Sequence, residues 1–68
     1  MTVYVNNRLF EISEDLTIDQ FLSQHLPDQP QLGVAIALNN QVIPKDRWSS
    51  QSLQNKDKLT IITATQGG

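Results

Sequence analysis

Apolar and polar residues alternate along the first twelve positions, as in strands that bury one face. Residues 2–6 (Thr-Val-Tyr-Val-Asn) are rich in β-branched and aromatic side chains, and residues 8–12 (Arg-Leu-Phe-Glu-Ile) continue the alternation. Asn6-Asn7 lies between them, and asparagine tolerates the positive φ angles of a tight turn. The pattern therefore predicts a β-hairpin. Its inward-facing side chains are expected to be Val3, Val5, Phe10 and Ile12.

A helical spacing replaces the alternation after residue 16. One stripe at i, i+3, i+4, i+7 and i+8 consists of Ile18, Phe21, Leu22, His25 and Leu26. Thr17 and Gln20 match a capping box at the start of this helix, and Pro27 ends it. A helix of about nine residues is marginal alone in water, so it must pack on a sheet.

Three more strands are predicted after the helix. They are residues 34–38, residues 41–43 after a second asparagine turn at 39–40, and residues 59–65 after a polar, turn-like cluster at 54–58. The order β-β-α-β-β-β predicts an α+β roll, in which one mixed sheet wraps over one helix. The predicted core comprises Val3, Val5, Phe10, Ile12, Ile18, Phe21, Leu22, Leu26, Val34, Ile36, Leu38, Leu59 and Ile61.

Length and composition exclude several classes of protein. A chain of 68 residues, 38% hydrophobic and 18% charged, fits one globular domain over 1–68. Without cysteine it has no disulfide or thiol nucleophile, and with one histidine it is not expected to bind a metal. A net charge of −2 disfavours nucleic acid. No stretch reaches the roughly 18 apolar residues of a membrane span, and no signal peptide is evident, so we expect a cytoplasmic location.

Catalytic side-chain arrangements are not evident. The carboxylates of Glu11, Glu14, Asp15 and Asp19 could act as acid and base, but their positions fit solvated strand and helix-start residues better. His25 lies on the apolar side of the helix, which favours a structural role. Because no glycine-rich phosphate loop exists either, we expect a protein that is not an enzyme and binds no cofactor itself.

The polar segment 45–52 leaves two interpretations open for each of its notable residues. Lys45 and Arg47 fit a solvated loop, and they also fit a docking site for a partner. Trp48 fits packing against the core, and less well a binding hot spot.

The chain ends in Gly67-Gly68, directly after the clearest predicted strand. One interpretation is a frayed terminus. The other is a flexible tail over residues 65–68, including Gln66, that passes through a channel too narrow for bulkier residues. In that case the carboxylate of Gly68 is the reactive group that reaches into a partner protein.

Several stretches carry a resemblance to a known family. They are residues 3–6 (Val-Tyr-Val-Asn), residues 35–45 (Ala-Ile-Ala-Leu-Asn-Asn-Gln-Val-Ile-Pro-Lys), Arg47-Trp48, residues 57–61 (Asp-Lys-Leu-Thr-Ile) and Gly67-Gly68. On these residues the whole chain resembles the ubiquitin-like β-grasp sulfur carriers, and most closely the ThiS family of thiamine biosynthesis.

The resemblance implies a mechanism and its partners. A ThiF-type adenylating enzyme uses ATP to activate the Gly68 carboxylate, and a sulfur donor system with a cysteine desulfurase converts it to a thiocarboxylate. A ThiG-type thiazole synthase then takes the sulfur for the thiazole ring. Three alternatives stay open: the small subunit of molybdopterin synthase, a protein modifier that forms an isopeptide bond to lysine, and an inert β-grasp interaction module.

Strand periodicity also predicts the surface that partners contact. If Leu59 and Ile61 face the helix, Ile62 and Ala64 face the other way. Ala37 on the third strand is expected to turn outward with them, as is Ala35. We therefore expect a flat, mildly apolar partner-binding patch that includes Ile62. The alternative is that the loop around Trp48 folds over this patch.

Overall fold

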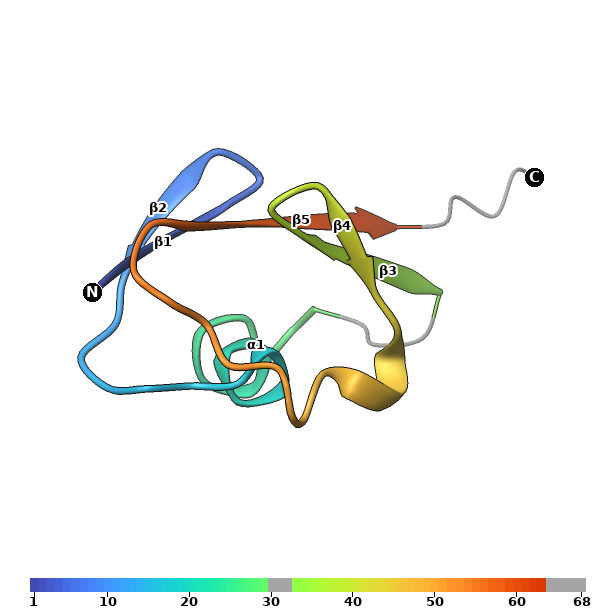
Figure 1. Cartoon of the computed structure of the whole chain (residues 1–68), viewed down its shortest axis with the longest axis horizontal. Coiled ribbons are helices and arrows are strands. Elements are labelled where there is room, and N and C mark those ends of the chain that lie inside the picture. The colour runs from blue at the N-terminus through green and yellow to red at the C-terminus, as the bar shows by residue number, and fades with distance from the viewer. Residues whose placement is uncertain (30–32, 64–68) are drawn as a thin grey trace.

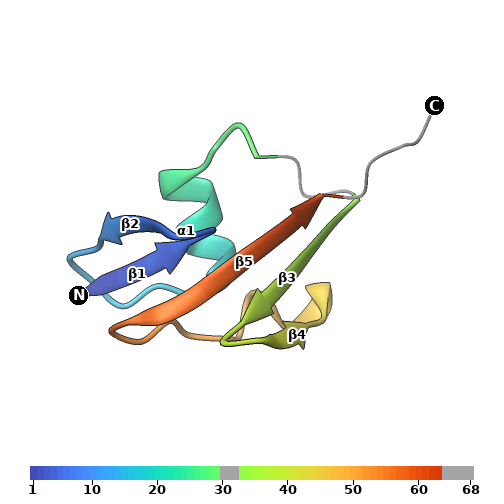
Figure 2. The ribbon, with the colours of Figure 1, turned by 90° about the horizontal axis from the view of Figure 1, so that it is seen from above.

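The computed structural model describes residues 1–29 and 33–63, which form a five-stranded sheet, one α-helix and one short 3-10 helix (Figure 1). In chain order, the elements are β1 (Thr2–Val5), β2 (Arg8–Glu11), α1 (Ile18–His25), β3 (Val34–Leu38), β4 (Gln41–Ile43), the 3-10 helix η1 (Lys45–Arg47) and β5 (Asp57–Thr63). The strands lie side by side in the order β2-β1-β5-β3-β4 (Figure 2). The β1–β5 pair is parallel and the other pairs are antiparallel, so the predicted mixed β-grasp sheet is confirmed.

Both hairpins turn through a pair of asparagines, as the sequence predicts. Asn6 and Asn7 have φ angles of 50° and 68°, and Asn39 and Asn40 have φ angles of 50° and 71°. Two successive residues with positive φ give the turn whose twist matches that of antiparallel strands. The registers of the two hairpins are thereby fixed by local chemistry.

Helix α1 begins and ends where its sequence signals indicate. Thr17 Oγ1 accepts a hydrogen bond from Gln20 N at 3.3 Å, and Gln20 Oε1 accepts one from Thr17 N at 3.0 Å. This is the predicted capping box, and it satisfies two backbone N–H groups at the helix start. The helix ends at His25, two residues before Pro27. None of the helices in the described residues has the length and hydrophobicity of a membrane span.

The core lies between α1 and one face of the sheet. The predicted core residues that are buried are Val3, Val5, Ile12, Ile18, Phe21, Leu22, Ile36, Leu38 and Leu59. The predicted residues that are only partly buried against this core are Phe10, Leu26, Val34 and Ile61. The core also contains Leu16 and Leu53, which the prediction omitted, and Trp48, for which packing against the core was the favoured interpretation. All three lie outside the helix and strands, where no period of apolar residues marks them.

The segment between β4 and β5 is packed below the sheet, on the side of α1 (Figure 1). Trp48 is 3% exposed and donates its indole N–H to Ile43 O at 2.9 Å. Its own carbonyl accepts from Asp19 N at 3.1 Å, at the start of the helix. The interpretation of Trp48 as a packing residue is confirmed, and the alternative that its loop covers the outward face of β5 is wrong.

Strand β5 begins two residues earlier than the sequence suggests. The polar composition of residues 54–58 predicts a turn, but Asp57 and Lys58 already pair with Val3 and Tyr4 of β1. This pairing joins residues about fifty positions apart, so local composition does not reveal it. Thr63 is the last described residue of β5, and the predicted continuation of the strand to residue 65 lies outside the described residues.

Candidate functional site

Strand β5 is the element that leads to the diglycine. It lies between β1 and β3 at the centre of the sheet, and it runs parallel to β1 and antiparallel to β3 (Figure 2). Leu59 is 1% exposed and Ile61 is partly buried, so both face the helix as predicted. The site residues Ala64, Gln66, Gly67 and Gly68 lie outside the described residues. The described part of the candidate site is therefore β5, the strand that precedes these residues, and the surface around its end.

The outward face of the sheet carries an apolar patch beside the end of β5. We call Ile62, Ala35 and Val42 the outer-face patch. Ile62 is 52% exposed and is paired with Ala35 of β3, while Val42 of β4 is 65% exposed. The predicted outward orientation of Ile62 and Ala35 is confirmed. Exposed aliphatic side chains from adjacent strands make a surface that a partner can bury.

Ala37 differs from the expectation. It occupies an outward register position between Val42 of β4 and Thr60 of β5, but only 9% of its surface is exposed. A methyl group between two larger cross-strand neighbours is shielded by them. Ala37 therefore forms the floor between Val42 and β5 and offers a partner little surface of its own, which corrects the predicted exposure.

Lys45 and Arg47 lie elsewhere on the molecule. Both are exposed and belong to η1, which lies on the same side of the sheet as α1 (Figure 1). Lys45 Nζ is 6.0 Å from the centroid of the Trp48 ring. Ile62 points to the opposite face of the sheet. The structure thus separates the predicted partner-binding residues into an apolar group on the outward face and a basic group on the helix side.

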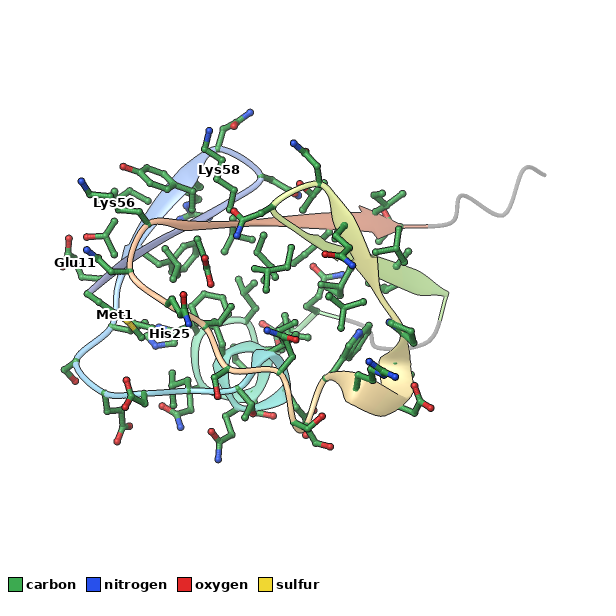
Figure 3. All side chains as sticks on the ribbon, in the orientation of Figure 1. Met1, Glu11, His25, Lys56 and Lys58 are labelled. Atoms are coloured by element: carbon green, nitrogen blue, oxygen red, sulfur yellow. The ribbon has the colours of Figure 1, made fainter. Side chains whose placement is uncertain are left out.

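Two exposed apolar residues on the outward face, Val42 and Leu9, were not predicted. Leu9 of β2 is 54% exposed and pairs with Tyr4 of β1, which in turn pairs with Lys58 of β5. Figure 3 shows Lys58 and Lys56 on the side of the sheet away from His25. The signal was present, because Phe10 facing inward requires Leu9 to face outward.

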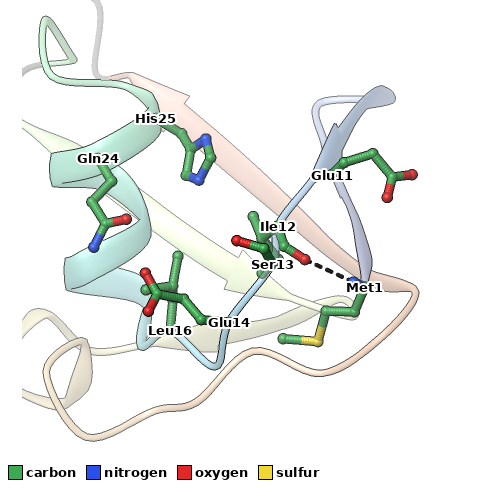
Figure 4. A pocket seen from close by; sticks show the side chains of 8 residues that line it. All are labelled: Met1, Glu11, Ile12, Ser13, Glu14, Leu16, Gln24 and His25. Atoms are coloured by element: carbon green, nitrogen blue, oxygen red, sulfur yellow. Dashed lines mark hydrogen bonds between the residues drawn. The ribbon is translucent and has the colours of Figure 1, made fainter.

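A pocket of about 460 Å³ lies between α1 and the chain that follows β2 (Figure 4). Helix α1 supplies Gln24 and His25, and the chain after β2 supplies Ser13 and Glu14. Nearby, the Met1 ammonium donates to Ile12 O at 2.7 Å. In residues 1–29 and 33–63, no group of three or more His, Asp or Glu side chains could hold a metal ion.

This pocket lies at the end of the sheet opposite Thr63, the last described residue of β5. Its rim includes Met1, and the carbonyl of Thr2 beside it accepts a hydrogen bond from Lys56 N, just before β5 begins. Thr63, at the other end of β5, is separated from Asp57 by about 20 Å at 3.3 Å per residue. His25 packs against aromatic rings, with 4.9 Å between its centroid and that of Phe21. The interpretation of His25 as a structural residue agrees with this stacking.

Comparisons with known proteins converge on one family. The model of the ThiS family matches residues 3–68. The sulfur carrier protein ThiS of Escherichia coli (strain K12) is 28% identical over 68 residues, which span all of both chains. The protein ycf40 of Porphyra purpurea is 32% identical over 68 residues, which span all of this chain and 93% of ycf40.

A solved structure shares the fold. The crystal structure of the thiamine biosynthesis protein ThiS from Geobacter metallireducens superposes with a TM-score of 0.84 at 21% identity, and the match covers 100% of each chain. The helix on a mixed five-stranded sheet is therefore a β-grasp arrangement of the ThiS type.

Proposed function

Because the chain belongs to the ThiS family, whose model matches residues 3–68, we propose that it is a sulfur carrier of thiamine biosynthesis. In this role it is a co-substrate of its partner enzymes and not an enzyme itself. The sulfur is held as a thiocarboxylate on Gly68. The observation that carries the proposal is the match to the family over nearly the whole chain, including the diglycine that follows β5.

The chemistry requires activation of the Gly68 carboxylate, because a carboxylate oxygen is a poor leaving group. A ThiF-type partner transfers AMP from ATP to this carboxylate and releases pyrophosphate. The terminal sulfur of a persulfide, charged by a cysteine desulfurase, then attacks the carbonyl carbon, and AMP leaves. A thiol cleaves the resulting sulfur–sulfur bond, so that the thiocarboxylate remains on Gly68. A ThiG-type thiazole synthase takes the sulfur from there.

The chain itself supplies shape and not catalytic groups in this scheme. The sheet presents β5 between two neighbours, and the outer-face patch offers an apolar surface for docking next to the end of that strand. Ile62 is the central contact of this docking surface. Once the patch is bound, delivery of the terminal carboxylate becomes an intramolecular event, which raises its effective concentration in the partner's ATP site.

Mass spectrometry tests this function directly. The chain is co-produced with a ThiF-type enzyme and a cysteine desulfurase, and the intact mass is measured. A sulfur carrier gains the mass difference between sulfur and oxygen, and loses it on incubation with a thiazole synthase and its other substrates. An adduct on a lysine of another protein would instead identify a modifier, and an unchanged terminus would identify an inert interaction module. Transfer of the sulfur to a molybdopterin precursor only would overturn the thiamine assignment.

A further inference from the structure

Asn6 remains bonded to β5 although it belongs to the turn that follows β1. Its main-chain N–H donates to Leu59 O at 3.0 Å. Its side chain then accepts from Ile61 N at Oδ1, at 2.8 Å, and donates from Nδ2 to Ile61 O at 3.4 Å. In a parallel ladder, the N–H and the C=O of one residue bond to two alternate residues of the neighbouring strand. The Asn6 side-chain oxygen therefore acts in place of its main-chain carbonyl.

This substitution follows from the turn. With a φ of 50°, Asn6 has left the extended conformation, and its carbonyl is no longer available to the ladder. The amide side chain restores the acceptor that Ile61 would otherwise lose. Asn6 thus extends the β1–β5 pairing by one position beyond its last backbone pair, Val5 with Leu59.

The two neighbouring strands of β5 stop pairing with it at different residues, so the bond that Asn6 makes to Ile61 is important. On one side, β3 pairs with β5 as far as Val34 with Thr63. On the other side, the pairing with β1 ends at Leu59. Beside Asn6 and Ile61 lies a pocket of about 190 Å³, bounded also by Arg8 and Phe10, and not a further strand. Among the described residues, the Asn6 side chain is what bonds the backbone of β5 on this side after residue 60.

We propose that Asn6 is a positioning residue for sulfur loading, because it fixes the direction in which the chain leaves the sheet toward Gly68. The inference rests on the proposed function. A strand held from one side is free to twist about its remaining ladder, and a small rotation at Ile61 grows with every residue beyond it. Presentation of a reacting group in the correct geometry affects the rate of the reaction more than the affinity of the complex.

Asn39 provides a matched control within the same sheet. It is also the first residue of an asparagine turn with a φ of 50°. Its main-chain N–H donates to Lys58 O at 2.8 Å, and its Oδ1 accepts from Lys58 N at 3.0 Å. It therefore makes the same type of side-chain bond to β5, but near the start of the strand. Loss of this bond affects the sheet without affecting the end that leads to Gly68.

Asn6→Gly and Asn39→Gly remove these side chains while keeping a residue that readily adopts positive φ. Hydrogen exchange should quicken at the Ile61 amide in the first variant and at the Lys58 amide in the second. In steady-state adenylation by a ThiF-type enzyme, we expect Asn6→Gly to lower kcat about ten-fold with little change in KM, because the carboxylate is misplaced by a small distance. Asn39→Gly should leave both constants close to those of the unchanged chain.

Asn6→Asp is the conservative variant, because it keeps the acceptor for Ile61 N and gives up only the 3.4 Å donor contact. It should recover most of the kcat that Asn6→Gly loses, and it keeps the test available if Asn6→Gly does not fold. Equal kcat values for the two glycine variants would overturn the positioning role, as would an increase in KM alone or an Asn6→Asp variant as slow as Asn6→Gly. If the unchanged chain is not adenylated at all, the proposed function fails first.

Discussion

Ile62→Asp tests whether the outer-face patch is the docking surface for the adenylating enzyme. Ile62 is 52% exposed in the free protein, so a partner can bury about half of its side chain. Full burial of an isoleucine stabilises by about 1.5–3 kcal/mol, and half of that is about 0.8–1.5 kcal/mol. The aspartate adds the cost of desolvating a charge in an apolar contact. The sum exceeds about 1.4 kcal/mol, so binding should weaken at least ten-fold.

Leu9→Asp is the matched control for this variant. Leu9 is 54% exposed, lies on the same outward face and would acquire the same charge. It belongs to β2 at the edge of the sheet, and β1 separates it from β5. We therefore expect Leu9→Asp to leave the affinity for the adenylating enzyme nearly unchanged.

The affinity of each variant for the ATP-free adenylating enzyme is measured by titration calorimetry, and hydrogen exchange checks that each variant is folded. A folded Ile62→Asp protein with unchanged affinity would refute the docking role and direct attention to Lys45 and Arg47 on the helix side. Equal losses for Ile62→Asp and Leu9→Asp would show that added negative charge weakens binding wherever it lies on this face. Unfolding of Ile62→Asp would contradict the exposure of this side chain.

The remaining predictions concern the core and the diglycine. Phe21 is fully buried, so Phe21→Ala should lower the free energy of unfolding by about 3–5 kcal/mol in denaturant titrations, and a loss below about 1 kcal/mol would contradict its packing in the core. Deletion of Gly68 should abolish adenylation, because it removes the carboxylate that is activated. The melting temperature should stay nearly unchanged, because the predicted core ends at Ile61. Thiocarboxylate formed by the deletion variant would exclude Gly68 as the sulfur-carrying residue. Gly67→Val should fold normally but be adenylated slowly, because a β-branched side chain restricts and widens the tail, and a rate equal to that of the unchanged chain would argue against a narrow channel.

Much of the fold, including the turns and the helix start, could be predicted because it depends on residues that are close together in the sequence. The asparagine pairs specify turns through their tolerance of positive φ, and Thr17 with Gln20 specifies the helix start through side-chain bonds three residues apart. Leu16 and Leu53 have no such signal. Leu53 N donates to Leu16 O at 2.8 Å, which joins two irregular segments that are far apart in the sequence. Only the assembled fold shows that both side chains are core.

The outward face was predicted less completely than the core, for a physical reason. Strand alternation states which side a residue faces, and it correctly assigned Ile62 and Ala35 to the side away from α1. Exposure depends also on the sizes of the cross-strand neighbours. Ala37 is shielded because Val42 and Thr60 flank it, and those neighbours become known only with the register. Partner surfaces on sheets therefore need the strand order as well as the alternation.

The two asparagine turns show the same limit in the candidate site. Their sequences and φ angles are alike, so composition and turn chemistry predict the same hairpin turn for both and do not distinguish their roles. Their positions along β5 differ, because β1 runs parallel to β5 and β3 runs antiparallel to it. The turn that ends β1 consequently bonds to Ile61, two residues from the last described residue of β5, while the turn that ends β3 bonds to Lys58 near its start. The opposite directions of two neighbouring strands thus give one asparagine, and not the other, access to the end of the strand that leads to Gly68.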